Sequence, residues 1–165
     1  MPDHLASLAS PGSAGAFADT RCAIHSRRVK DPRVDAKGED IELARPPVRV
    51  LVVDDSEFMR MTVKKLLPPG RFEVCGEAST GAEALAAYAR LHPDMVTLDI
   101  TMPDMTGIEA LRAITSLDPE ARILMCTANH TPADVVNAMR AGARDYVAKP
   151  FKTDRFLEAL DRVMA

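Results

Sequence analysis

Residues 48–55, VRVLVVDD, decide the fold class of this chain. The run 48–53 is short, β-branched and without a two-residue period, which is typical of a strand buried on both faces of a parallel sheet. Two aspartates follow it directly, and Ser56 comes next as a candidate N-cap of a helix. The stretch therefore predicts a buried strand that leads straight into a helix.

The same alternation of strand and helix continues to the end of the sequence. Apolar runs predict the strands, segments with helical spacing follow them, and breakers such as Pro68-Pro69-Gly70 separate the two. The predicted strands are 48–53, 72–78, 95–98, 122–126 and 145–148. The predicted helices are 57–67, with Ser56 as its cap, 80–91, 107–117, 132–141 and 153–164. This order predicts an α/β fold, a five-stranded parallel sheet with five helices on its two faces and right-handed crossovers.

Residues 1–47 differ from the rest of the chain. They contain the linker-like stretch 10–15, Ser-Pro-Gly-Ser-Ala-Gly, followed by mixed charges and prolines with few apolar residues. Such a composition is typical of a segment that forms no packed core. We therefore predict a disordered N-terminal extension over 1–47, with a regulatory arm as the alternative, and a folded domain over 48–165.

Composition excludes several classes of function. The net charge of −3 argues against a nucleic-acid surface, and no apolar run approaches the about 20 residues of a membrane span. Cys22, Cys75 and Cys126 have neither metal-ligand nor disulfide-framework spacing, which favours a reducing compartment. The N-terminus also lacks the basic charge and apolar stretch of a signal peptide. We expect a cytoplasmic monomer with no nucleic-acid or membrane partner.

Polar and charged residues follow four of the predicted strands. Asp54 and Asp55 follow the first strand, and Asp99, Thr127 and Lys149 follow the third, fourth and fifth. The carboxyl ends of parallel strands meet at one edge of the sheet, where open α/β folds bind their ligands. Taken singly, these residues are explained as a helix cap, turn acids, a strand threonine and a surface lysine. Such separate explanations do not predict that all of them occur at one edge.

The chemistry of this group points to phosphoryl transfer. Acids gathered at one edge repel each other unless a cation lies among them, and Mg²⁺ binds carboxylates while it keeps waters that a phosphate can replace. Lys149 adds a positive charge and Thr127 a hydroxyl. Phosphoryl transfer depends mainly on such positioning and charge neutralisation, so Asp99 would act as a nucleophile that forms an aspartyl phosphate. Pro150 permits a cis peptide bond after Lys149.

Four stretches of the chain resemble the receiver domains of bacterial two-component systems, most closely the stand-alone chemotaxis regulators of the CheY type. The stretches are VRVLVVDDSEFMRMTVKKLL (48–67), DMVTLDITMPDMTGIEAL (94–111), ILMCTA (123–128) and DYVAKPF (145–151). The resemblance covers 48–165 and implies the flavodoxin-like, CheY-like sheet order 2-1-3-4-5.

The resemblance also implies a role for each residue of the group. Asp99 is then the phosphoacceptor, which takes its phosphoryl group from the phosphohistidine of a histidine kinase. The Mg²⁺ ligands implied by the family are Asp55, Asp99 and the backbone carbonyl of Thr101, with Asp54 bound through water. Thr127 and Lys149 contact the phosphoryl group. Met102-Pro103 and Gly107 match the loop after the phosphoacceptor, where the glycine permits a tight approach to the next helix.

The signal would leave the domain through a change of packing. Phosphorylation replaces one negative charge by roughly two, which draws in Thr127 and Lys149 and shifts a population between two states. Tyr146 matches the aromatic switch of the family, which packs inward when Thr127 moves; an ordinary core or edge aromatic is the alternative. Thr101 and Asn129 would flank the path of the attacking water and tune the lifetime of the phosphate.

Helix four, strand five and helix five, about 132–164, form the output surface implied by the family. No output module follows within the sequence, so we expect the output to be contact with another protein. We expect a signalling domain, not an enzyme, which catalyses only its own phosphorylation and slow dephosphorylation.

Three other functions are alternatives for a chain with this pattern. A phosphorelay intermediate or phosphate sink would use the same site and pass the phosphoryl group to a histidine phosphotransfer protein. A haloacid-dehalogenase-like phosphatase would need Asp-x-Asp after the first strand and room for a cap domain, whereas this chain has adjacent aspartates. A dinucleotide-binding domain would need a G-x-G-x-x-G motif, which does not follow the first strand.

Overall fold

The computed structural model describes residues 45–128 and 131–165. Within these residues, five strands and five helices alternate along the chain. The strands are β1 (Val48–Val53), β2 (Phe72–Ala78), β3 (Met95–Asp99), β4 (Ile123–Thr127) and β5 (Asp145–Ala148). The helices are α1 (Glu57–Leu66), α2 (Gly81–Leu91), α3 (Gly107–Leu117), α4 (Pro132–Arg140) and α5 (Thr153–Met164).

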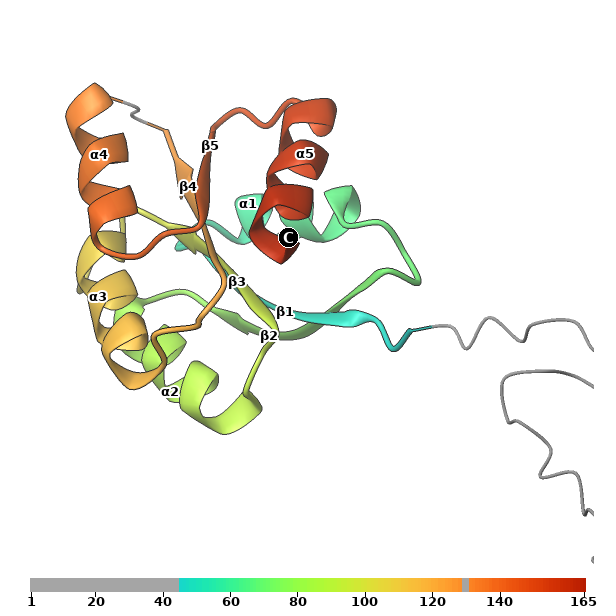
Figure 1. Cartoon of the computed structure of the whole chain (residues 1–165), viewed down its shortest axis with the longest axis horizontal. Coiled ribbons are helices and arrows are strands. Elements are labelled where there is room, and N and C mark those ends of the chain that lie inside the picture. Colours follow the sequence, from blue (N-terminus) through green and yellow to red (C-terminus); the bar gives the residue numbers. More distant parts are fainter. Residues whose placement is uncertain (1–44, 129–130) are drawn as a thin grey trace, which may run out of the picture. The chain divides into compact units, whose positions relative to one another are not determined.

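All strands belong to one parallel sheet in the order β2-β1-β3-β4-β5 (Figure 1). This order confirms the predicted fold class and topology. β1 lies between β2 and β3 and pairs with both. Its residues Val50–Val53 are buried alternately in the apolar layers on the two faces of the sheet, as the lack of a two-residue period predicted.

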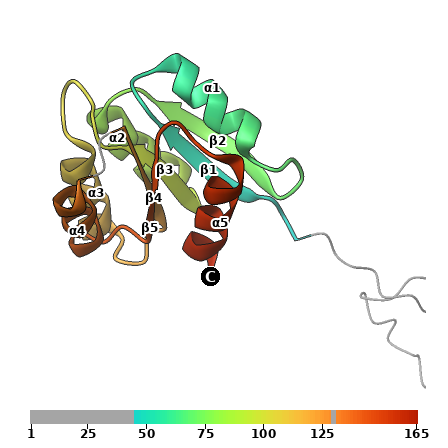
Figure 2. The same ribbon diagram turned by 90° about the horizontal axis from the view of Figure 1, so that it is seen from above.

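The helices cover the two faces of the sheet unequally. Figures 1 and 2 show α2, α3 and α4 on one side and α1 and α5 on the other. Alternate residues of β1 face the two layers: Leu51 packs in the core under α2 and α3, and Val52 packs in the core with Phe156 and Leu160 of α5. Two separate apolar layers therefore hold the sheet, and its carboxyl edge is left for polar groups.

Side-chain caps fix where the helices begin. Ser56, Thr80, Thr106 and Thr131 each accept a hydrogen bond from the backbone N–H three residues later. Ser56 is the N-cap of α1, as predicted, whereas the prediction that placed Thr80 inside its helix was off by one residue, because Thr80 serves as the N-cap of α2 with an extended backbone. At α1 the cap starts the helix close behind β1, so Asp54 and Asp55 are held at the carboxyl edge of the sheet; Lys152, at the start of α5, makes no such hydrogen bond.

Strand β4 begins and ends one residue later than predicted, at Ile123 and Thr127. Thr127 belongs to the sheet because it pairs with Ala148 of β5. No helix among residues 45–128 and 131–165 has the length and apolar character needed to cross a membrane. The predicted extension over 1–47 lies, apart from its last three residues, outside the described part of the chain.

Candidate functional site

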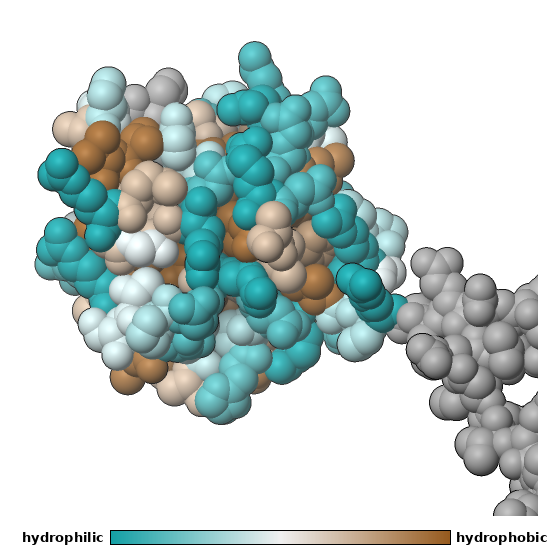
Figure 3. Space-filling view, in the orientation of Figure 1, coloured by the Kyte–Doolittle hydropathy of each residue, from teal (hydrophilic) through white to brown (hydrophobic). Residues whose placement is uncertain are grey.

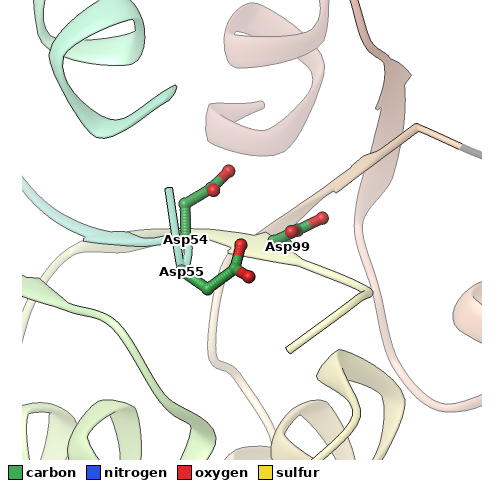
Figure 4. A group of neighbouring side chains, drawn as sticks. All are labelled: Asp54, Asp55 and Asp99. Atoms are coloured by element: carbon green, nitrogen blue, oxygen red, sulfur yellow. The ribbon is translucent and has the colours of Figure 1, made fainter. Parts of the chain in front are cut away.

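Three carboxylates meet at the carboxyl edge of the sheet. Asp54 and Asp55 follow β1, and Asp99 ends β3, which pairs directly with β1. One oxygen of each lies within 4.8 Å of the others (Figure 4). Asp54 and Asp99 are only 2% and 4% exposed, whereas Asp55 is exposed. Like charges this close and this buried require a positive partner.

Lys149 supplies one such partner from two strands away. It follows β5, and its side chain reaches past β4 so that Nζ lies 2.7 Å from Asp54 Oδ2 and 3.0 Å from Asp99 Oδ1. Its backbone N–H donates to the Thr127 carbonyl at 2.7 Å, and its peptide bond with Pro150 is cis. The ammonium group therefore bridges the acids of two different strands.

The two adjacent aspartates have different surroundings. Asp54 Oδ2 accepts from Lys149, and Asp54 Oδ1 accepts from the backbone N–H of Ser56 at 3.0 Å. Asp55 makes no hydrogen bond or ion pair with any of the described residues. Both oxygens of Asp54 are thus already engaged, while the Asp55 carboxylate is available to an ion or to water.

The pKa values of both Asp99 and Lys149 are raised, for different reasons. Burial raises the pKa of Asp99 above its usual range, although Lys149 and the Thr101 backbone N–H act to lower it and Asp54 adds to the rise. Burial acts to lower the pKa of Lys149, but its hydrogen bond to Asp54 and its ion pair with Asp99 outweigh this effect and raise it. Lys149 therefore stays a cation at any physiological pH.

One oxygen of Asp99 can still accept a hydrogen bond or bind a cation. Its Oδ1 is buried and forms the ion pair with Lys149, yet it has no partner in hydrogen-bond geometry among the described residues. The surrounding ligands are all oxygen atoms, which is the donor set that a hard divalent cation prefers. The residues present therefore fit Mg²⁺, with Asp55 and Asp99 as the carboxylates best placed to bind it directly.

The remaining predicted residues lie around this centre or apart from it. Thr127 ends β4 and is 2% exposed, on the strand between Asp99 and Lys149. Thr101 is exposed, two residues after Asp99. Tyr146 is 37% exposed, so its side chain is not enclosed in the core. Asn129 lies outside the described residues.

Sequence reasoning missed Arg60, which supports the turn that carries the aspartates. Its Nη1 donates to the backbone carbonyl of Asp54 at 2.8 Å, and its Nε donates to Glu77 Oε2 at 3.1 Å. A helical side chain leans toward the N-terminus of its helix, so an arginine one turn into α1 covers the end of β1. That direction was the available signal in the sequence.

Gly107 permits the close approach expected of it. A Cβ atom at this position would lie 1.9 Å from the backbone oxygen of Asp99, so no other residue fits without movement of the backbone. The Gly107 N–H donates to the Ile100 carbonyl at 2.8 Å, which closes the loop that follows Asp99.

Comparison with known proteins places the chain in a family. The sequence model of the response regulator receiver domain matches residues 50–161. The chemotaxis protein CheY of Thermotoga maritima is 49% identical over 115 residues, which are 70% of this chain and 96% of that protein. CheY of Bacillus subtilis is 48% identical over 116 residues, which are 70% of this chain and 97% of that protein.

Solved structures agree with the sequence relatives. The CheX–CheY–BeF₃–Mg²⁺ complex from Borrelia burgdorferi has a TM-score of 0.69 and 29% identity, over 81% of this chain and 96% of that chain. The response regulator domain of Thermotoga maritima CheB has a TM-score of 0.64 and 34% identity, over 72% of this chain and 98% of that chain. Sequence, fold and the acidic edge of the sheet agree: this chain belongs to the family of response regulator receiver domains and is of the CheY type.

Proposed function

We propose that this protein is a response regulator of a two-component system that accepts a phosphoryl group on Asp99 in the presence of Mg²⁺. The observation that carries the proposal is the arrangement of three carboxylates within 4.8 Å, of which Asp54 and Asp99 are bridged by Lys149, with a buried Asp99 oxygen that has no hydrogen-bond partner among the described residues. The domain boundaries of the proposal are 48–165, with 1–47 as an extension.

In this proposal, an Asp99 carboxylate oxygen attacks the phosphorus of a phosphohistidine on a histidine kinase. A phosphorus–oxygen bond forms, the phosphorus–nitrogen bond breaks, and the imidazole leaves with the electron pair of that bond. Asp55, Asp99 and the Thr101 carbonyl would hold Mg²⁺, which supplies positive charge to the phosphoryl oxygens when bound.

Two further side chains take part. Lys149, kept cationic by its raised pKa, would move from Asp99 to a phosphoryl oxygen. Thr127, next to it on β4, would donate its hydroxyl to another. Tyr146 would then turn inward into the space that Thr127 leaves, which links the phosphorylated site to the surface of β5.

The proposed output is contact with another protein through α4, β5 and α5. Val136 and Met139 of α4 are 46% and 44% exposed, and Tyr146 lies on the neighbouring strand. Figure 3 shows hydrophobic side chains gathered over α4 among hydrophilic ones. Exposed apolar residues of this kind suit a partner that binds and leaves. The chemotaxis proteins among the relatives support a role in chemotaxis or motility. A cytoplasmic location and a monomeric state are further parts of the proposal.

The test is the intact mass of the protein after incubation with acetyl phosphate and Mg²⁺. We expect a gain of one phosphoryl group that requires Mg²⁺ and is absent in Asp99→Asn. The matched control is Asp154→Asn, which removes an exposed acid of α5 and should leave the gain unchanged. No gain with acetyl phosphate or with a panel of histidine kinases would contradict the proposal.

A second experiment separates a chemotaxis-type regulator from a phosphorelay intermediate. Binding of a target protein that strengthens on phosphorylation favours the regulator. Rapid transfer of the phosphoryl group from Asp99 to a histidine phosphotransfer protein favours the relay.

A further inference from the structure

Asp104, in the loop between β3 and α3, caps a helix that begins 23 residues earlier in the chain. Its Oδ1 accepts from the backbone N–H of Gly81 at 3.0 Å, and its Oδ2 accepts from that of Ala82 at 3.1 Å. These are the first two residues of α2. The side chain of Thr80 accepts from the next N–H, that of Glu83, at 3.1 Å. Asp104 therefore supplies two of the three acceptors that satisfy the start of α2.

Met105, the residue after Asp104, packs against the start of α2. A Cβ atom at Gly81 would lie 2.8 Å from the Cβ of Met105, so the loop approaches α2 closely enough to require a glycine there. Met105 is itself packed against the core under α2 and α3. The loop is thus attached to α2 by two hydrogen bonds and by direct packing.

Hydrogen bonds hold both ends of this loop next to Asp99. The Ile100 N–H donates to the Cys126 carbonyl at 3.1 Å, and the Gly107 N–H donates to the Ile100 carbonyl at 2.8 Å. Between them lies Thr101, whose backbone N–H is close enough to lower the pKa of Asp99. Thr101 is the first residue of this closed loop after Ile100, so the position of its backbone beside Asp99 depends on how the rest of the loop is held.

We infer that Asp104 is a positioning residue for the phosphorylation site: by holding the loop against α2, it sets the place of the Thr101 backbone beside Asp99. An aspartate suits this role because its two oxygens accept from two N–H groups at once, whereas an asparagine offers a single acceptor. The inference rests on the proposed function for the metal, since the Thr101 carbonyl is a proposed Mg²⁺ ligand.

The test compares three variants of the full chain. Asp104→Ala removes both hydrogen bonds to α2, and Asp104→Asn removes one. Thr80→Ala is the matched control, because it uncaps the same helix at Glu83 and leaves the loop untouched. The readouts are the Kd for Mg²⁺ by calorimetry, the urea midpoint without metal, and the amide chemical shift and exchange rate of Thr101 without metal.

We expect Asp104→Ala to weaken Mg²⁺ binding by about fivefold to tenfold, Asp104→Asn to weaken it less, and Thr80→Ala to leave it within about twofold. The factor should persist at high salt, where a pure charge effect of an exposed carboxylate is screened. The Thr101 amide should change in both Asp104 variants and not in Thr80→Ala, while the urea midpoint falls in all three.

Equal Mg²⁺ affinity in Asp104→Ala and the wild type, or an equal loss in Thr80→Ala, would overturn the inference and leave Asp104 as a helix cap only. If Asp104→Ala does not fold, Asp104→Asn decides in the same way. If the wild type itself binds no Mg²⁺, the proposed function fails, and the Thr101 amide in metal-free protein still decides whether Asp104 holds the loop.

Discussion

Lys149→Met removes the ammonium group from the acidic edge and keeps most of the apolar stem. In the wild type, Nζ lies 2.7 Å from Asp54 Oδ2 and 3.0 Å from Asp99 Oδ1, and the two carboxylate side chains are only 3% and 5% exposed. Loss of one partner of a buried ion pair costs about 3–5 kcal/mol. Because the lysine side chain is 12% exposed, we expect the lower end of this range. The free energy of unfolding should fall by about 3 kcal/mol, or about 10 °C in Tm.

Urea unfolding in metal-free buffer and in Mg²⁺ measures this effect. Mg²⁺ supplies the positive charge that the variant lacks, and the ammonium group no longer competes for Asp99. Excess Mg²⁺, which adds about 2.7 kcal/mol at a hundredfold excess over its Kd, should therefore stabilise the variant more than the wild type and narrow the gap between them. Lys65→Met is the control, since Lys65 is an exposed lysine of α1 without an ion pair among the described residues.

The reasoning is refuted if Lys149→Met unfolds at the same urea concentration as Lys65→Met in metal-free buffer. It is equally refuted if the gap to the wild type stays constant or widens as Mg²⁺ is added. Either result would mean that the ammonium group does not offset repulsion between the carboxylates.

Two more predictions concern residues outside the acidic cluster. Tyr88→Phe removes a 2.7 Å hydrogen bond from a buried hydroxyl to Asp118 and should cost about 1–2 kcal/mol. This hydrogen bond holds the pKa of Asp118 below its usual range, so it stabilises the fold above the ordinary pKa of the carboxyl, and the stabilisation is lost as pH falls through the lowered pKa. In urea unfolding, the stabilities of Tyr88→Phe and the wild type should therefore converge in acid. A difference in stability that does not change with pH would contradict the role given to this hydrogen bond. Arg60→Ala should slow phosphorylation by acetyl phosphate about tenfold, because it loosens the turn after β1. The control Lys64→Ala loses only the contact with Glu77 that both residues share, and should be phosphorylated at nearly the wild-type rate. Equal rates in all three proteins would exclude a role for Arg60.

The fold followed from local patterns that the structure preserves. The run Val48–Val53 lacks a two-residue period because helices cover both faces of the sheet at β1. The errors were of one residue, at Thr80, at the C-terminal ends of α1, α4 and β3 and at both ends of β4, where a cap or a pairing decides the boundary. Such boundaries depend on tertiary contacts that a periodicity does not contain.

The candidate site was predictable in its members but not in their individual surroundings. The sequence placed the three acids at one edge, since parallel strands end together. It did not distinguish Asp54, whose oxygens are taken by Lys149 and the Ser56 N–H, from the exposed Asp55. That difference depends on a lysine that reaches past β4, which requires the strand order and the side-chain direction together.

Supporting residues were the least predictable. Asp104 acts on an N–H 23 residues away, and its exposed position in a loop carries no periodic signal. The sequence left two interpretations of Tyr146, a switch aromatic and an ordinary core or edge aromatic, and no local pattern specified that its side chain would be 37% exposed.

The most direct test of the account locates the phosphoryl group itself. The protein is phosphorylated with Mg²⁺ present, reduced with borohydride so that an acyl phosphate becomes homoserine, and digested for peptide mass spectrometry. The account predicts homoserine in place of Asp99, in the peptide that contains β3, and none when Mg²⁺ is removed. Homoserine at Asp54 or Asp55, or an unreduced Asp99 in protein that has gained a phosphoryl group, would contradict it.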